Sequence, residues 1–231
     1  MKPISFIITC PYYDNGIKSL GSKCLLSIKR KKIIEKQCSA IEKFCKDIEY
    51  EIILVNSIDH TKTQKFIEKK LPYVNYVYAD SGNINYGGSF IKGLALAKYP
   101  NVVNIECGLV LSAISINNLI SGNQDIAVGC VTNKHKQNID IDLGCVINEN
   151  KVTNLFFGLD NKYIGILYIN EIVKDFILEN FTFEAHKNKF LFELINYCIS
   201  KGYSCEATIL KGKDTHLVFN KKSLQQYIGT T

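Results

Sequence analysis

The chain has 231 residues, of which 46% are hydrophobic, and its 28 Lys and Arg against 22 Asp and Glu give a formal net charge of +6. This length and apolar content suffice for one large α/β domain with a sizeable core. The mild positive charge favours anionic ligands, but the basic residues are spread along the chain, so we expect no nucleic-acid partner. No apolar run reaches the roughly twenty residues of a membrane span, so we expect no membrane partner and no signal peptide.

The nine cysteines lie within apolar segments, and no two of them have the Cys-x-x-Cys spacing typical of zinc sites. We therefore expect reduced, mostly buried thiols in a cytoplasmic protein, without a structural zinc ion.

Strands and helices alternate through the first half of the chain. Apolar runs predict strands at 4–9, 50–55, 74–78 and 101–111, and apolar residues at three- and four-residue spacing predict helices at 31–47, 61–70, 89–98 and 115–120. The first strand is apolar throughout, which indicates burial on both faces. This alternation predicts right-handed crossovers and a mostly parallel sheet.

Shorter strands dominate the second half. They are predicted at 125–131, 143–148, 151–157, 163–169, 203–210 and 216–219, with helices at 172–179, 189–201 and 223–227. Gly202 follows the second of these helices and is a good C-cap residue. With no internal repeat or linker, the chain is predicted to form a single α/β domain over residues 1–231, a Rossmann-like three-layer sandwich with a mostly parallel central sheet.

The loop after the first strand is a candidate phosphate site. It carries Gly16, Lys18, Gly21 and Lys23. Glycine lets backbone N–H groups approach an anion, and lysine supplies the opposite charge. An ordinary strand-to-helix connection with solvated lysines is the alternative. Next along the chain, the basic run 29–32 lacks interleaved aromatic residues, so we expect a solvated turn there rather than a nucleic-acid contact.

Several short segments recur in the order found in a known family. They are Gly16-Ile17-Lys18, SKCLLSI at 22–28, IIEKQ at 33–37, EIILV at 51–55, NYGGSF at 85–90, NIECGLVL at 104–111, KFLFELIN at 189–196 and DTHLVFN at 214–220. Their order and spacing resemble the sugar-nucleotidyltransferase family, which has the nucleotide-diphospho-sugar transferase fold, and the resemblance spans nearly the whole chain.

The resemblance implies transfer of a nucleotidyl group from a nucleoside triphosphate, with CTP as one candidate. The acceptor would be a sugar phosphate or a small phosphorylated alcohol, as in polysaccharide biosynthesis. Residues 1–120 would form the nucleotide-binding half and residues 121–231 the acceptor-binding half. Lys18 and Lys23 would be the catalytic residues, because they neutralise charge on the α-phosphate and the leaving pyrophosphate.

The same resemblance implies further binding residues. Gly16 would belong to the loop that wraps the triphosphate. Asn85, Gly88 and Ser89 would lie beside the nucleobase, where glycine permits close approach and the following helix favours anions at its N-terminus. A plain turn before a helix is the alternative for this segment.

The family also holds Mg²⁺ with two carboxylates, and this part of the pattern is altered here. The first carboxylate is expected at Gly108 or Leu109, neither of which binds metal. Glu106 lies two residues earlier, so on a strand it points to the same face as Gly108. Asp214 is the nearby candidate for the second ligand. A catalytically inactive nucleotide-binding relative is therefore one alternative.

A second alternative comes from another enzyme class. Pro11-Tyr12-Tyr13 resembles the end of the first strand in inverting glycosyltransferases, which use nucleotide-sugars. Ile139-Asp140-Ile141-Asp142 has the Asp-x-Asp spacing of their metal motif. The competing interpretation of these two aspartates is the solvated face of an edge strand.

Overall fold

A computed structural model describes residues 2–11, 21–79, 84–132, 143–159, 161–211, 215–218 and 223–225. Its central sheet has nine strands. In chain order they are β1 (Ile4–Cys10), β4 (Tyr50–Asn56), β5 (Asn75–Tyr78), β6 (Asn101–Glu106), β8 (Ile126–Thr132), β9 (Leu143–Asn148), β10 (Lys151–Phe157), β11 (Asn161–Ile169) and β12 (Cys205–Ile209). In space their order is β5-β4-β1-β6-β11-β8-β12-β10-β9, so strands from both halves of the chain share one sheet.

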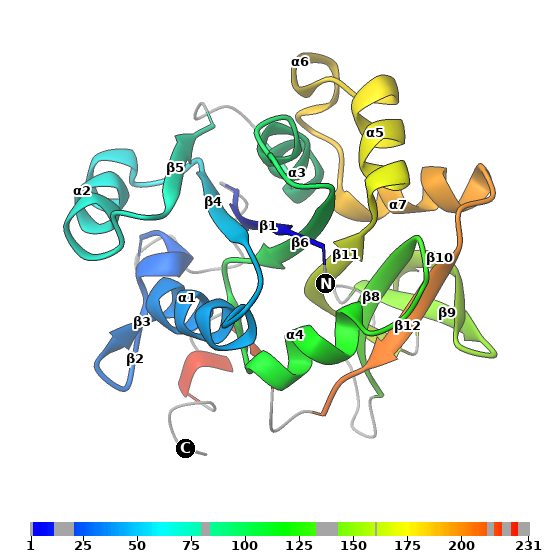
Figure 1. The fold of residues 1–231 in the computed structure, drawn as a ribbon, viewed down its shortest axis with the longest axis horizontal. Helices are drawn as coiled ribbons and strands as arrows, with labels where there is room; N and C mark the ends of the chain where they lie inside the picture. The colour runs from blue at the N-terminus through cyan, green and yellow to red at the C-terminus, as the bar shows by residue number, and fades with distance from the viewer. Residues whose placement is uncertain are drawn as a thin grey trace.

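Helices cover both faces of this sheet (Figure 1). They are the short 3-10 helix η2 (Lys23–Leu25), α1 (Ile33–Phe44), α2 (His60–Lys70), α3 (Tyr86–Leu94), α4 (Ala113–Ile120), α5 (Glu171–Asn180), α6 (Phe183–His186) and α7 (Leu191–Ser200). One apolar cluster joins α1, α2 and α4 to the sheet, and a second joins α3, α5 and α7 to it. The predicted three-layer α/β sandwich is confirmed. No helix in the described residues is long and apolar enough to cross a membrane.

The core of the sheet is mostly parallel, as predicted. β1 pairs in parallel with β4 and β6, β4 pairs in parallel with β5, and β8 pairs in parallel with β12. All seven residues of β1 are buried, which confirms the prediction of a strand buried on both faces. The antiparallel strands are β11, which runs antiparallel to β6 and to β8, and β10, which runs antiparallel to β12 and to β9.

Further pairings complete the sheet at its β9 end and add two small sheets. β9 pairs with β10 and, at Asn161 and Lys162, also with β11. The strand β13 (Thr215–Leu217) pairs with β7 (Leu109–Leu111), and β2 (Ser27–Ile28) pairs with β3 (Lys31–Lys32) in a hairpin. Strand β13 therefore lies directly beside the segment that follows β6.

The continuous strand predicted at 101–111 is wrong, because a turn at Cys107 and Gly108 separates β6 from β7. The Gln37 side-chain amide donates to the Glu106 carbonyl at 2.9 Å and to the Leu109 carbonyl at 2.8 Å, which holds the turn. Both partners lie far from Gln37 in sequence, so the local apolar pattern could not predict the break.

Several helix boundaries also differ from the prediction, and three of them have a clear structural reason or consequence. Helix α1 begins at Ile33 rather than Lys31, because Lys31 and Lys32 form β3. Helix α3 covers Tyr86–Leu94 rather than 89–98, so the two glycines lie inside the helix and the alternative of a plain turn before it is wrong. Helix α7 begins at Leu191, and the short α6 before it was missed. Gly202 has φ +94°, so its predicted place just beyond the end of α7 is confirmed.

Candidate functional site

The candidate site lies at the carboxyl ends of the parallel strands. β1 ends at Cys10, β4 at Asn56 and β6 at Glu106, and residues Thr9 and Glu106 are paired across β1 and β6. Ligands of open α/β sheets bind at this edge, because the loops that leave the strand ends form a crevice there. The residues that carry the chemistry are therefore expected along this edge.

Lys23 and Glu106 come together at this edge. Lys23 is partly buried at the start of η2. Burial raises the pKa of the Glu106 carboxyl to about 7, and the positive charge of Lys23 lowers it in part. Two residues that are distant in sequence thus share one electrostatic environment. The site can offer a phosphate one lysine cation together with a carboxyl that is easily protonated.

Gly165 makes room for the Glu106 side chain. Its φ is +81°, and a Cβ at this position would lie 3.0 Å from the Cβ of Glu106 and 3.1 Å from its Oε2. A side chain on residue 165 would therefore displace the carboxyl and strain the backbone. This glycine lies where the pairing of β11 with β8 is irregular, between Tyr163 and Leu167.

Two tyrosines flank the same carboxyl. Burial raises the pKa of the Tyr86 and Tyr163 phenols, and the negative charge of Glu106 adds to the effect on both. The Tyr163 hydroxyl is buried and has no hydrogen-bond partner among the described residues. The side chain of Asn104 is its polar neighbour and lowers the pKa of the Tyr163 phenol in part. A buried polar group without a well-formed hydrogen bond costs free energy.

Thiols and a serine form the base of the site. The Ser22 hydroxyl lies 3.3 Å from the Cys10 sulfur and 3.0 Å from the Cys24 sulfur, and it donates to the Asn56 side chain at 3.3 Å. Hydrogen bonds from the Cys107 and Cys24 thiols hold the pKa of Cys10 well below its usual range. These contacts fix η2 against the ends of β1, β4 and β6. All nine cysteines are free and buried, which confirms the prediction of buried thiols.

The start of α3 is fixed by packing against the chain before α7. The Asn85 side chain donates to the Asn188 carbonyl at 2.6 Å, and its backbone N–H donates to the Lys187 carbonyl at 3.0 Å. A Cβ on Gly88 would overlap the Lys187 backbone. Ser89 is fully buried, and its hydroxyl has no partner among the described residues. The contacts give Asn85 and Gly88 a packing role, and their place beside a nucleobase stays a prediction.

Several predicted residues lie outside the described parts of the chain. They are Gly16, Lys18 and Asp214, together with Asp140 and Asp142 of the alternative metal motif.

The residues that the structure describes do not by themselves fit a Mg²⁺ site. A Cβ on Gly108 would lie 2.6 Å from the Val218 carbonyl oxygen, and Leu109 is fully buried in the core, so neither position has room for a carboxylate. Glu106 supplies one carboxylate, and no three His, Cys, Asp or Glu side chains in the described ranges form a group that could hold a metal ion. Mg²⁺ in nucleotide sites is bound by one or two carboxylates together with substrate phosphates and water molecules, and the described residues supply one of these carboxylates, Glu106.

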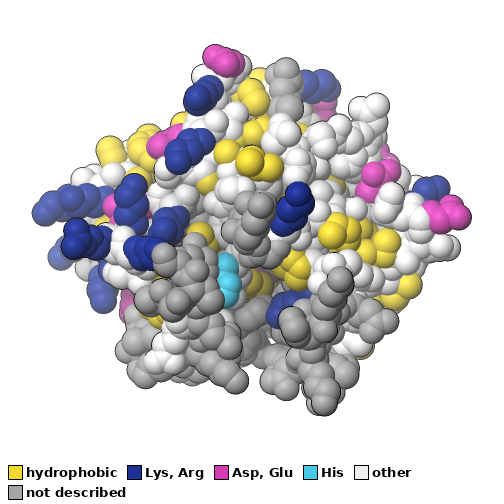
Figure 2. Space-filling model, turned by 90° about the horizontal axis from the view of Figure 1, so that it is seen from below, with side chains coloured by type: hydrophobic (Ala, Val, Ile, Leu, Met, Phe, Trp, Pro, Cys, Tyr) yellow, Lys and Arg dark blue, Asp and Glu magenta, His cyan; other side chains and the backbone are white. Residues whose placement is uncertain are grey.

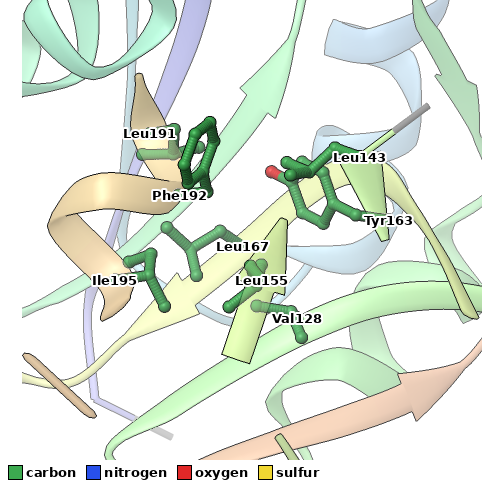
Figure 3. A pocket seen from close by; sticks show the side chains of 8 residues that line it. All are labelled: Val128, Leu143, Leu155, Tyr163, Leu167, Leu191, Phe192 and Ile195. Atoms are coloured by element: carbon green, nitrogen blue, oxygen red, sulfur yellow. The ribbon is translucent and has the colours of Figure 1, made fainter. Parts of the chain in front are cut away.

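The part of the edge beyond Tyr163 is apolar. Figure 3 shows Tyr163 with Phe192, Leu143 and other apolar residues around a gap that is too narrow for a water molecule. Phe192 in turn contacts the rings of Phe156, Phe157 and Phe190, with ring centroids 5.4 to 5.7 Å away. Phe156 is 53% exposed and Phe157 37%. This wall offers rings and aliphatic groups to a ligand.

Four residues of the site were not predicted from sequence. Tyr86, Tyr163 and Gly165 carry no local signal, since their role comes from contacts between distant segments. Gln37 did carry one, because it stands four residues from both Ile33 and Ile41, on the apolar stripe of α1, and is fully buried. A polar residue on that stripe indicates a buried hydrogen-bonding role.

The fold is that of the nucleotide-diphospho-sugar transferase type, which confirms the predicted resemblance at the level of the fold. No protein-family model matches the chain, and no curated protein matches it. Solved structures match over nearly the full length of both chains, with sequence identities that establish the fold alone.

Three of these structures illustrate the likeness. The inositol-1-phosphate CTP transferase from T. maritima has a TM-score of 0.76 and 10% identity, over 96% of this chain and 93% of that one. The CTP:phosphocholine cytidylyltransferase from Streptococcus pneumoniae has a TM-score of 0.75 and 15% identity, over 100% and 99%. The 4-diphosphocytidyl-2C-methyl-D-erythritol synthase from Anaerococcus prevotii has a TM-score of 0.67 and 15% identity, over 99% and 98%.

Proposed function

We propose that this protein is a nucleotidyltransferase, which moves a nucleotidyl group from a nucleoside triphosphate to a sugar phosphate or a small phosphorylated alcohol. The observation that carries the proposal is the position of Lys23. Its ammonium acts on Glu106 and Cys107 at the strand ends, within a fold that the three named enzymes share over nearly their full length.

The reaction needs charge compensation more than acid–base chemistry. An oxygen of the acceptor phosphate attacks the α-phosphorus, a new phosphorus–oxygen bond forms, and the bond to the β-phosphate breaks to release pyrophosphate. The attacking oxygen is already anionic, so no side chain has to deprotonate it. Lys23 would stabilise the negative charge that gathers on the α-phosphate and the leaving group. Lys18 would assist from the preceding loop.

The two substrates would be bound by different halves of the chain. Residues 1–120, with Lys23, Glu106, Asn85, Gly88 and Ser89, would bind the nucleotide, and residues 121–231 would bind the acceptor. CTP is the first nucleotide to test, because the names of all three enzymes described above refer to CTP or to a cytidyl group. Nine free thiols support a reducing, cytoplasmic location.

A thermal-shift screen with the four nucleoside triphosphates, with and without Mg²⁺, tests the proposal. A nucleotide at a hundred times its Kd should stabilise the folded protein by about 2.7 kcal/mol. The variant Lys23→Ala should lose this shift, whereas Lys69→Ala, an exposed lysine in the last turn of α2, should keep it. Release of pyrophosphate is then measured with a panel of phosphorylated acceptors.

The outcomes separate the three functional hypotheses. Stabilisation lost in Lys23→Ala, together with pyrophosphate release, supports the nucleotidyltransferase. Stabilisation without turnover, with or without Mg²⁺, would instead identify an inactive nucleotide-binding relative. A shift with nucleotide-sugars alone would favour the glycosyltransferase.

A further inference from the structure

A second cavity lies between η2 and α2. It is a groove of about 320 Å³, lined by Ser22, Leu25, Leu26, Ser27, Lys32, Lys62 and Phe66. Neither Lys23 nor Glu106 lines it, and Ser22 is the residue that it shares with the base of the strand-end site. Its volume falls at the lower end of the range of small-molecule pockets, which begins at about 300 Å³.

The polar part of this groove is positive. Lys32 comes from β3 and Lys62 from α2, and the lining contains no carboxylate. In the described part of the chain neither lysine forms an ion pair. Two nearby carboxylates accept hydrogen bonds from the backbone. The N–H of Lys32 donates to Glu35 at 2.6 Å, and the N–H of Ser22 donates to Asp59 at 3.0 Å. Two cations without acidic partners favour an anionic ligand.

The hairpin that carries Lys32 is strained. Its turn residues Lys29 and Arg30 have φ of +49° and +68°. Two-residue turns of this kind normally use Asn and Gly, because other side chains disfavour a positive φ. The tight turn brings Lys32 opposite Ser27, where its ammonium donates to the Ser27 hydroxyl at 2.8 Å. Strain that is retained in a fold often marks a functional position, and here it sets the rim of the groove.

The surface around the groove is basic as well. Figure 2 shows Lys and Arg side chains gathered on the left of the molecule, the side on which the hairpin and α2 lie in Figure 1. Such a field attracts anions to the groove mouth and raises their rate of association.

We propose that this groove is a binding site for an organic phosphate of about nucleotide size. The phosphate would lie between Lys32 and Lys62 beside the Ser27 hydroxyl. The apolar or planar part of the ligand would pack on Leu25, Leu26 and Phe66. Small-molecule sites combine an apolar lining with a few placed polar groups in this way.

The groove shares a wall with the strand-end site. The segment that carries Lys23 also contains Ser22, Leu25 and Leu26. The Ser22 hydroxyl forms hydrogen bonds with Cys10, Cys24 and Asn56. A ligand in the groove would therefore restrain the position of Lys23. This consequence, a regulatory effect on nucleotidyl transfer, rests on the proposed function. The binding site itself does not.

Calorimetric titration of the full chain with CMP, ribose 5-phosphate and inorganic pyrophosphate tests the site. Lys62→Glu is compared with Lys65→Glu, which makes the same charge change on the same helix outside the groove, and both side chains are exposed. We expect Lys62→Glu to weaken one class of CMP sites by about tenfold or more, and Lys65→Glu by less than about twofold. Lys23→Ala should leave this class intact.

The probes distinguish the parts of the ligand. Tighter binding of CMP than of ribose 5-phosphate would assign the planar base to the Phe66 side of the groove. Equal binding of pyrophosphate and CMP would overturn the apolar half of the proposal. Equal losses in Lys62→Glu and Lys65→Glu, or the loss of all CMP binding in Lys23→Ala, would overturn the site. If no turnover is found but Lys62-dependent CMP binding remains, the proposed function is wrong and the proposed binding site in the groove is still supported.

Discussion

The edge of the sheet that carries the candidate site has a polar end around Glu106 and an aromatic end around Phe157, and the two are built from different kinds of side chain. Around Glu106 the chain gathers a lysine, two tyrosines and three thiols. The Gln37 side chain holds two backbone carbonyls there, and the Ser22 hydroxyl donates to the Asn56 side chain. Around Phe157 it gathers phenylalanine rings, with centroids 5.4 to 6.0 Å apart.

The difference concerns how each end keeps its shape. The polar end depends on a few directional contacts between segments far apart in sequence, so one substitution can remove a large share of them. The aromatic end depends on many small dispersion contacts, none of which is decisive. Substitutions should therefore have large effects near Glu106 and graded effects near Phe157.

The largest effect is expected for Gly108→Asp, which would place a carboxylate where the sugar-nucleotidyltransferase family has one. The new Cβ would lie 2.6 Å from the Val218 carbonyl oxygen, so the β6–β7 turn or β13 must move. We expect a loss of about 3–5 kcal/mol in the free energy of unfolding, measured by urea denaturation.

Gly202→Asp is the matched control for that prediction. Gly202 has φ +94°, and a Cβ added there would meet no atom within 4 Å, so the change should cost only about 1 kcal/mol of backbone strain. Equal losses in the two variants would contradict the crowding argument.

Gln37→Leu should have the next largest effect. The leucine fits the apolar stripe of α1 but leaves the carbonyls of Glu106 and Leu109 without their donor. A loss of about 2–4 kcal/mol is expected, because two backbone acceptors lose their partner. Urea denaturation is the measurement, and Gln64→Leu, whose amide bonds the exposed Glu68, should change stability by less than about 0.5 kcal/mol.

Glu106→Gln should alter the pH dependence of stability. An unfolded glutamate has a pKa of about 4.3, and burial raises the pKa of Glu106 to about 7 in the folded protein. The folded state therefore binds the proton more tightly, and the resulting stabilisation is complete below about pH 4 and is lost as the pH rises through about 7. Between about pH 5 and 8 the wild type should lose about 1–3 kcal/mol relative to the variant, less than the full linkage value because the side chain is partly exposed.

Unfolding midpoints measured in urea across this pH range check the prediction. Glu171→Gln, an exposed carboxylate paired with Lys2, is the control and should follow the wild-type profile. Parallel profiles for the wild type and Glu106→Gln would show that the carboxyl titrates normally in the folded protein.

The smallest effect is expected at the exposed ring of the aromatic end. Phe156 is 53% exposed, so Phe156→Ser should cost no more than about 1 kcal/mol in a thermal or urea melt. Phe192→Ser, at a ring that is only 8% exposed, should cost about 3 kcal/mol or more. Similar losses at the two positions would show that the four rings act as one cooperative unit.

The sequence indicated the polar end only in part. Lys23 could be selected because the resemblance places the family's lysine there, and Glu106 because it lies two residues before the expected metal carboxylate, on the same face of the predicted strand. Tyr163 and Gly165 could not, because they reach that edge only through β11. Its reversed direction between β6 and β8 leaves no trace in the alternation of apolar residues, which sets the face of a side chain but not the direction of a strand.

The second pairing of β9 has a consequence for how copies of this protein meet one another. Strand β9 pairs with β10 and also with β11, so the backbone groups at that end of the nine-stranded sheet form hydrogen bonds within the sheet. The other end is β5, only four residues long, and short edge strands are poor templates for intermolecular pairing. The strand order therefore protects both ends of the sheet from pairing with another copy of the protein. We expect a longer β5 to weaken this protection first.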